Sequence, residues 1–234
     1  KRTGILKRKF PSGPIPAEKF YGKITIEDLR DKKSLAEYIK KKRNRFLFNP
    51  QGIKPYARYM QDILTSVDKA VIVKVADNAV KGKLYCFNRW TADYGHPINW
   101  HHNPVTKHQW PPDRHWVDIE ELSPTSGDVK YVWEASRFTQ VFYFVRAYAL
   151  TQNEKYARAF WEQIEHWLQE NPPELGINWK CGQEISFRTF AWLVGLYAFL
   201  DSPQTTDERI FNLLKNLYYN ALHIEKNIDF ALKA

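Results

Sequence analysis

Strongly helical segments follow one another through the second half of the chain, and they constrain the fold more than any other feature. The stretch VKYVWEASRFTQVFYFVRAYAL spans 129–150 and follows Asp128, a residue type that caps helices. The next stretch, NEKYARAFWEQIEHWLQEN, has Asn153 as its cap and stops at Pro172-Pro173. The short turns between such segments predict antiparallel helix pairs.

Two further segments continue this pattern. The stretch from Gly182 to Leu200 is apolar nearly all round, as expected of a helix covered on most sides. Thr205 and Glu208 form a capping-box pattern that opens a last helix from about Asp207 to the end. No convincing strand alternation is found, so the sequence predicts an all-α fold of repeated helix pairs. Either a solenoid or a closed ring of pairs fits this periodicity.

The chain before these helices is less regular. Residues 1–30 carry many Lys and Arg with interspersed Pro and Gly, which predicts an extended basic arm, either solvated or anion-binding. Residues 31–83 predict three short helices. We expect them to begin at Ser34, with Pro55 in a first turn, and at Ser66 as a cap, and to end near 45, 64 and 80.

The segment 84–130 is irregular and rich in turn-forming residues. It carries four of the nine Trp residues, namely Trp90, Trp100, Trp110 and Trp116. Such a long loop with so many rings is expected to bury them against the body or to line a site with them. With helical hairpins over 131–234, we expect residues 1–234 to form a single helical domain.

Composition limits the partners of this chain. Lys and Arg number 35 against 26 Asp and Glu, a formal net charge of +9, which favours an anionic partner such as nucleic acid, acidic lipid or acidic polysaccharide. Aromatic residues make up 15% of the chain and suit stacking on sugars or bases. No apolar run is long enough to span a membrane. Cys86 and Cys181 are too few for a disulfide framework, and whether they pair stays open.

Three groups of residues are candidates for chemistry. The first is GHPINWHHNPVTKHQWPPDRHW, which holds five His and three Trp. No HExxH pattern is present, so zinc binding is disfavoured and no metal site is predicted. Either the His and Asn side chains hydrogen-bond the loop to itself, or Trp100, His101 and their neighbours contact carbohydrate.

The second group lies in NPPELGINWKCGQEISFR, residues 171–188. Glu184 and Arg188 stand four apart on one helix face, and in an apolar helix they must pair or face a polar cleft. The alternatives are a structural salt bridge and a cleft wall. In the cleft wall, Arg188 meets a ligand carboxylate or sulfate, Glu184 holds Arg188 or a sugar hydroxyl, and Trp179 supplies a stacking face, next to Asn178.

The third group is Glu134 and Arg137 with Trp133. The two charged residues are three apart and predict an ion pair among aromatic side chains, which serves either core packing or ligand contact. No phosphate-binding Gly-rich loop, GxSxG motif or Cys/His nucleophile pattern is found, so phosphoryl and acyl transfer are disfavoured and no cofactor is predicted.

These motifs together resemble a known family. FNRW, INWHHNPVTKHQWP, GDVKYVWEASRF and the NPP...GINW...EISFR run are similar, from about Tyr85 to Phe199, to the amino-terminal helical domain of the heparinase II/III-like polysaccharide lyases. The resemblance implies an incomplete (α/α) toroid, followed in the family by a β-sandwich region. It also implies β-elimination of a uronic-acid-containing polysaccharide, either heparin or heparan sulfate-like or alginate-like.

The resemblance also implies how the reaction proceeds. Family members neutralise the sugar carboxylate with an Asn or His, and a Tyr and a His act as base and acid. The family's Asn lies in an Asn-His motif shortly after the helix that here reaches Ala234, and no Asn-His pair occurs in this sequence. We therefore expect a toroid truncated at its carboxyl end, with the catalytic residues beyond Ala234 and the fragment inactive alone.

What carries over residue by residue is the substrate-binding wall. The matching positions are Trp100, His101, Trp133, Glu134, Arg137, Asn178, Trp179, Glu184 and Arg188. The implied partners are an anionic polysaccharide and the missing β-sandwich region of the same parent chain, with neither nucleic acid nor membrane. Because the polysaccharide is external, we expect a periplasmic or secreted protein.

Three other functions compete with this interpretation. A non-catalytic carbohydrate-binding or scaffold module of helix pairs would use the Trp and Arg residues for recognition only. A glycoside hydrolase would need two convergent carboxylates, for which Glu134 and Glu184 are candidates that already have Arg partners. A nucleic-acid binder would need its charge on one face, whereas much of it falls in the first 45 residues.

Overall fold

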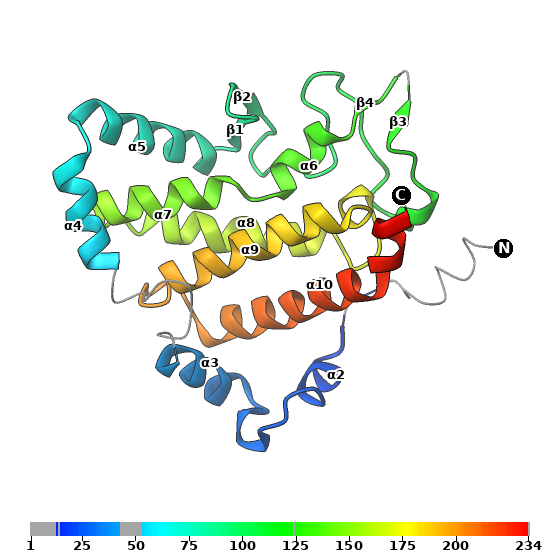
Figure 1. The fold of residues 1–234 in the computed structure, drawn as a ribbon, viewed down its shortest axis with the longest axis horizontal. Helices are drawn as coiled ribbons and strands as arrows, with labels where there is room; N and C mark the ends of the chain where they lie inside the picture. The colour runs from blue at the N-terminus through cyan, green and yellow to red at the C-terminus, as the bar shows by residue number, and fades with distance from the viewer. Residues whose placement is uncertain (1–12, 14, 43–52, 124, 234) are drawn as a thin grey trace.

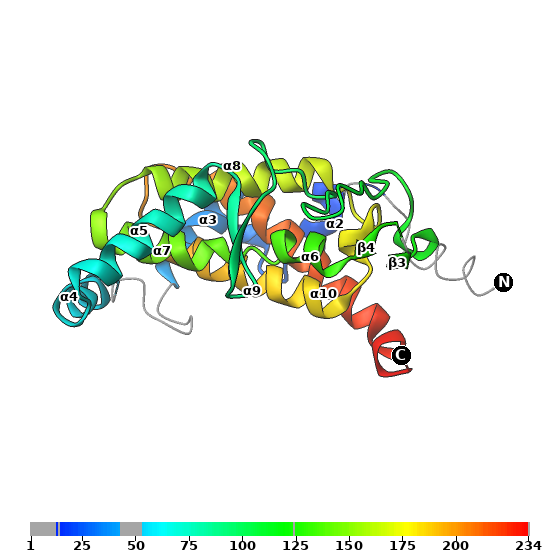
Figure 2. The ribbon, with the colours of Figure 1, turned by 90° about the horizontal axis from the view of Figure 1, so that it is seen from above.

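The computed structural model describes residues 13, 15–42, 53–123 and 125–233 (Figure 1). Four helices form its body: α7 (Gln140–Thr151), α8 (Lys155–Glu170), α9 (Gly182–Ala198) and α10 (Asp207–Lys233). Helix α7 packs against α8 and α9, and α9 packs against α10. Figure 2 places α8 on one side of the molecule and α9 on the other. The helix-rich structure confirms the predicted all-α class.

The predicted single helix over 129–150 is wrong, because two helices replace it. Helix α6 (Lys130–Ser136) ends before a turn in which Phe138 takes a left-handed φ of 59°, and α7 begins at Gln140. The Phe138 ring is fully buried and stacks on Trp100 with 5.1 Å between the ring centroids. Burial of this ring accounts for a backbone strain that helix periodicity does not reveal.

Short strands occur inside the segment predicted to be irregular. Strands β1 (Lys83–Cys86) and β2 (Trp90–Asp93) form an antiparallel hairpin in which Cys86 pairs with Trp90. Strands β3 (Leu122–Ser123) and β4 (Gly127–Asp128) form a second, smaller one. In Figure 2 the β1–β2 hairpin reaches across the molecule towards the side on which α9 lies.

Helices in the first part of the chain begin one or two residues earlier than predicted. Helix α3 (Lys32–Lys41) is capped by the carboxylate of Asp31, which accepts a hydrogen bond from the Ser34 N–H. Its predicted end near residue 45 lies outside the described residues. Helix α5 (Ser66–Val80) is capped by Thr65, which forms a capping box with Asp68. Ser34 is therefore the third residue of α3 and not its first, and Ser66 is a helical residue and not the predicted cap.

The predicted basic arm is partly structured. Its residues Ala17–Tyr21 form helix α2, and a short 3₁₀ turn (η1) follows at Glu27–Leu29. Phe20 of α2 is buried against Phe211 of α10, with 5.8 Å between the ring centroids. The remaining helix, α4 (Ile53–Ile63), has position 55 in its first turn as predicted, and it packs against α7.

The start of α10 differs from the predicted capping box. The hydroxyl of Thr206 accepts a hydrogen bond from the Arg209 N–H at 3.2 Å, so Thr206 takes the capping role. The Thr205 hydroxyl points inward instead, where it donates to the Phe199 carbonyl and accepts from Trp161 Nε1. A buried indole N–H needs an acceptor, which explains why Thr205 is drawn into the core.

Close packing of α8 and α9 depends on a glycine. A Cβ atom added at Gly195 would lie 2.2 Å from the Phe160 ring of α8, closer than any carbon contact allows.

Among the described residues, no helix is both long and apolar enough to cross a membrane.

Candidate functional site

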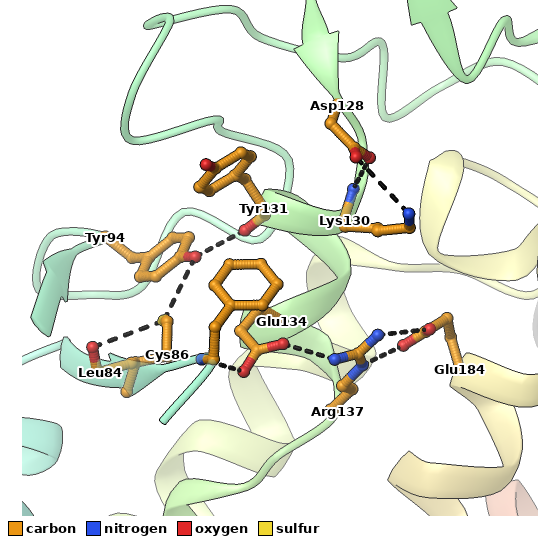
Figure 3. Close-up of polar contacts among 10 residues, drawn as sticks. Leu84, Cys86, Tyr94, Asp128, Lys130, Tyr131, Glu134, Arg137 and Glu184 are labelled. Atoms are coloured by element: carbon orange, nitrogen blue, oxygen red, sulfur yellow. Dashed lines mark hydrogen bonds and ion pairs between the residues drawn. The ribbon is translucent and has the colours of Figure 1, made fainter. Parts of the chain in front are cut away.

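The turn between α6 and α7 brings three charged side chains together (Figure 3). Arg137 donates from Nε and Nη2 to the two carboxylate oxygens of Glu184, at 2.5 and 2.8 Å. Its Nη1 donates to Glu134 at 2.5 Å, which confirms the predicted pair of Glu134 and Arg137. We call these three residues the Glu-Arg-Glu cluster. It joins α6 and the following turn to the first turn of α9.

The Glu-Arg-Glu cluster also holds the β1–β2 hairpin. The second carboxylate oxygen of Glu134 accepts a hydrogen bond from the Phe87 N–H at 2.8 Å, at the tip of the hairpin. Both Glu side chains are buried, whereas that of Arg137 is 22% exposed. Glu184, through its hydrogen bonds above all, raises the pKa of Arg137. Two carboxylates against one guanidinium sum to a formal charge of −1, so the charge of Arg137 is fully balanced.

The predicted partner of Glu184 is wrong, because Glu184 binds Arg137 and not Arg188. Arg188 is fully buried, and its guanidinium lies over the Trp167 ring at 4.1 Å from the centroid, with Trp179 and Trp192 also nearby. Its Nη1 donates a long 3.4 Å hydrogen bond to a backbone carbonyl, while Nε and Nη2 have no partner. Burial lowers the pKa of Arg188 to about 9.

The remaining predicted site residues lie in the interior. Trp100 donates to His166, and its carbonyl accepts from the Asn178 side chain at 2.8 Å. Trp179 and Trp133 each donate from the indole nitrogen to a backbone carbonyl. The His101 ring is within 3.1 Å of the Glu170 carbonyl, and burial lowers its pKa. These side chains fix the loop and turn behind the cluster, and their contact with substrate stays a prediction.

Neither cysteine is in a disulfide, and both are free thiols. Cys86 is buried beside the Tyr94 hydroxyl, as Figure 3 shows, and burial raises the pKa of its thiol to about 11. Within the described ranges, no three His, Cys, Asp or Glu side chains lie close enough together to hold a metal ion.

A second polar network was not predicted from the sequence. The fully buried carboxylate of Glu174 accepts hydrogen bonds from Trp116 Nε1 and the Tyr219 hydroxyl, and lies 2.7 Å from His223 Nδ1. The amide of Asn227 contacts the other nitrogen of His223. Burial, with Glu174 as a smaller cause, raises the pKa of Tyr219. The network ties α10 to the turn that follows α8, and the four-residue spacing of the polar side chains on α10 was its only sequence signal.

The accessible aromatic residues are also different from those predicted. Phe187 and Phe190 of α9 are each 47% exposed, and Phe187 lies under the Arg137 guanidinium. On α7, Tyr143 is half-buried and contacts Tyr85 of β1 edge to face. We call Tyr85, Tyr143, Phe187 and Phe190 the aromatic strip. Sequence could not identify it, because α9 is apolar nearly all round.

Known proteins resemble this chain in sequence and in fold. A family profile described as Heparinase II/III N-terminus matches residues 22–232. The solved heparan sulfate lyase of Pedobacter heparinus is 23% identical with a TM-score of 0.59, and the match covers 84% of this chain and 28% of that one. A solved heparinase III is 18% identical with a TM-score of 0.57, covering 92% of this chain and 34% of that one. These likenesses show a shared fold, and this chain spans about a third of their length. No curated protein matches significantly.

Proposed function

The chain belongs to the family of heparinase II/III N-terminal regions, and we propose that it forms the amino-terminal helical part of a polysaccharide lyase. The proposed substrate is a uronic-acid-containing polysaccharide, of the heparan sulfate or the alginate type, and the proposed reaction is β-elimination. The observation that carries the proposal is the family match, which spans nearly the whole chain.

The proposed architecture is an incomplete (α/α) toroid. Antiparallel hairpins α7–α8 and α9–α10, with α7 packed beside α9, supply the repeated unit that such a ring needs. In this arrangement the exposed sides of α7 and α9 belong to the substrate-facing wall.

The Glu-Arg-Glu cluster is the proposed centre of that wall. A guanidinium has five N–H groups, of which Arg137 uses three within the cluster. The two that remain suit a sugar hydroxyl, since the charge of Arg137 is already balanced. The buried residues behind the cluster, Trp100, Asn178 and Trp179, hold the wall in place. They support substrate binding through position and not through direct stacking.

The proton-transfer steps are assigned to residues outside 1–234. β-Elimination requires a group that neutralises the sugar carboxylate, a base for the proton on the adjacent ring carbon, and an acid for the departing oxygen. By resemblance to the family, we assign these groups to an Asn-His motif and to later Tyr and His residues, in a protein that also has a β-sandwich region. Residues 1–234 alone are therefore proposed to be inactive, within a periplasmic or secreted protein.

The test is an assay of the unsaturated uronate product by its ultraviolet absorbance. The full-length protein is incubated separately with heparan sulfate, hyaluronan and alginate, next to residues 1–234 alone. We expect product from the full-length protein with at least one of these substrates and none from residues 1–234. Turnover by residues 1–234 would contradict the assignment of catalysis to other residues, and no turnover by the full-length protein on any substrate would contradict lyase activity.

A further inference from the structure

The arginines that the sequence suggested for anion binding are not free to do so. Arg137 is neutralised by two carboxylates in the Glu-Arg-Glu cluster. Arg188 is fully buried beneath Trp rings and reaches no surface. Other cationic side chains must therefore bind a polyanionic ligand on this side of the molecule.

Two other arginines belong to the elements that carry the aromatic strip, namely the β1–β2 hairpin and α7. Arg89 is exposed at the tip of the β1–β2 hairpin, just after Phe87 and Asn88, whose φ angles of 51° and 54° form the tight turn. Arg146 of α7 lies over the Tyr143 ring at 4.4 Å from the centroid, and its Nε donates to the Phe142 carbonyl. Within the part of the chain that the structure describes, neither guanidinium forms an ion pair with a carboxylate.

Contacts connect these two arginines through the strip to the cluster. Tyr143, which carries Arg146, contacts Tyr85 of β1 with 6.4 Å between the ring centroids. The same hairpin continues to its tip, where the Phe87 N–H binds Glu134 and Arg89 follows. From the cluster, Arg137 reaches the exposed Phe187 of α9 at 5.6 Å. These contacts join the elements that carry the half-exposed rings to the elements that carry two arginines without a carboxylate partner.

We propose that Arg89 and Arg146 bind the carboxylate or sulfate groups of the polysaccharide, while Phe187 and Phe190 stack on its sugar rings. This inference rests on the proposed function and names the residues that recognise its substrate. Arg89, Arg146 and the three residues of the Glu-Arg-Glu cluster carry three positive and two negative charges, a sum of +1, which favours an anionic over a neutral sugar chain. Guanidinium groups match carboxylate and sulfate oxygens with paired hydrogen bonds.

The test measures binding of a size-defined heparan sulfate oligosaccharide to the full-length protein by calorimetry, at low and at high salt. The variants are Arg89→Gln and Arg146→Gln. The matched control is Arg158→Gln, an exposed arginine of α8, the helix that Figure 2 shows on the side away from α9. We expect each of the first two to weaken binding about tenfold and to reduce its salt dependence. Arg158→Gln is expected to bind like the wild type.

Several outcomes would overturn the inference. These are wild-type binding in Arg89→Gln and Arg146→Gln, absence of oligosaccharide binding by the wild type, or equal affinity for a single-stranded DNA, which would indicate a nucleic-acid surface. Thermal melts check that the variants fold, and Arg146→Lys, which keeps the charge, is expected to retain part of the affinity. The product assay is run on the same samples. If the wild type cleaves the polysaccharide and both variants bind the oligosaccharide as the wild type does, the inference alone is contradicted. If the variants bind more weakly but the wild type forms no product, the lyase proposal alone is contradicted.

Discussion

Arg137 and Glu184 are joined by two parallel hydrogen bonds, at 2.5 and 2.8 Å, which tie the turn between α6 and α7 to the start of α9. The two residues are far apart in the sequence and come from different predicted helix pairs. The pair therefore fixes the position of this turn relative to α9, at the proposed substrate wall.

The excess of carboxylates in the Glu-Arg-Glu cluster predicts an order of effects. Arg137→Gln leaves two buried carboxylates facing each other without a cation, and we expect a loss of about 3–4 kcal/mol in the free energy of unfolding. Glu184→Gln removes one charge but leaves Arg137 paired with Glu134, so the expected loss is about 1–2 kcal/mol. Urea denaturation measures both, with the exposed neighbour Gln183→Glu as a control. The reverse order would contradict the described pairing.

The buried guanidinium of Arg188 predicts that its charge contributes little to stability. Burial without a carboxylate partner offsets what the Trp167 ring contributes through its face. We expect Arg188→Met, which fills the space without charge, to stay within about 1 kcal/mol of the wild type. Arg188→Ala leaves a cavity and is expected to lose about 3 kcal/mol. Equal losses in the two variants, measured by thermal denaturation, would show that the charge itself is required.

Substitution of Gly195 tests the contact between α8 and α9. An added methyl group would overlap the Phe160 ring, so Gly195→Ala is expected to lose about 1–3 kcal/mol of folding stability. Phe160→Leu in the same protein should make room for the methyl group and recover part of that loss. A double variant whose loss equals the sum of the two single losses would indicate that the residues do not meet.

The two cysteines are expected to react at different rates. The pKa of Cys86 is raised to about 11 by burial, while Cys181 is only partly buried. Iodoacetamide at mildly alkaline pH should therefore alkylate Cys181 first, with Cys86 labelled only after denaturation, as mass spectrometry of peptides would show. Since the thiol pKa is about 8.5 in an unfolded chain, the stability from the neutral Cys86 thiol is present below that pH. It is lost as the pH rises through about 11. Equal labelling of both thiols in the folded protein would contradict burial of Cys86.

Sequence patterns predicted what is local in this fold and missed what is tertiary. Helix periodicity and the Pro-Pro stop placed α8 and α9 within a few residues, and the three-residue spacing of Glu134 and Arg137 predicted their ion pair. The four-residue rule also predicted a pair of Glu184 and Arg188, but it considers one helix alone, and a neighbouring turn supplied a better partner. Likewise, the left-handed Phe138 follows from packing against Trp100, which lies in a distant loop.

The exposure of the aromatic side chains was also not predictable from local sequence patterns. The sequence predicted Trp100, Trp133 and Trp179 as substrate-binding residues, with Trp179 as a face for sugar stacking. The structure buries all three, since their rings fill the space between the irregular loop and the helices. Exposure depends on which side of a uniformly apolar helix has a neighbour, and that information is absent from the sequence of α9.

The most direct test of the lyase assignment is digestion of heparan sulfate by the full-length protein in water enriched in oxygen-18, followed by mass spectrometry of the products. β-Elimination adds no water, so we expect products with a double bond at the new non-reducing end and no oxygen-18 from the cleavage step. Products that carry one oxygen-18 and lack the double bond would show hydrolysis and contradict the lyase assignment.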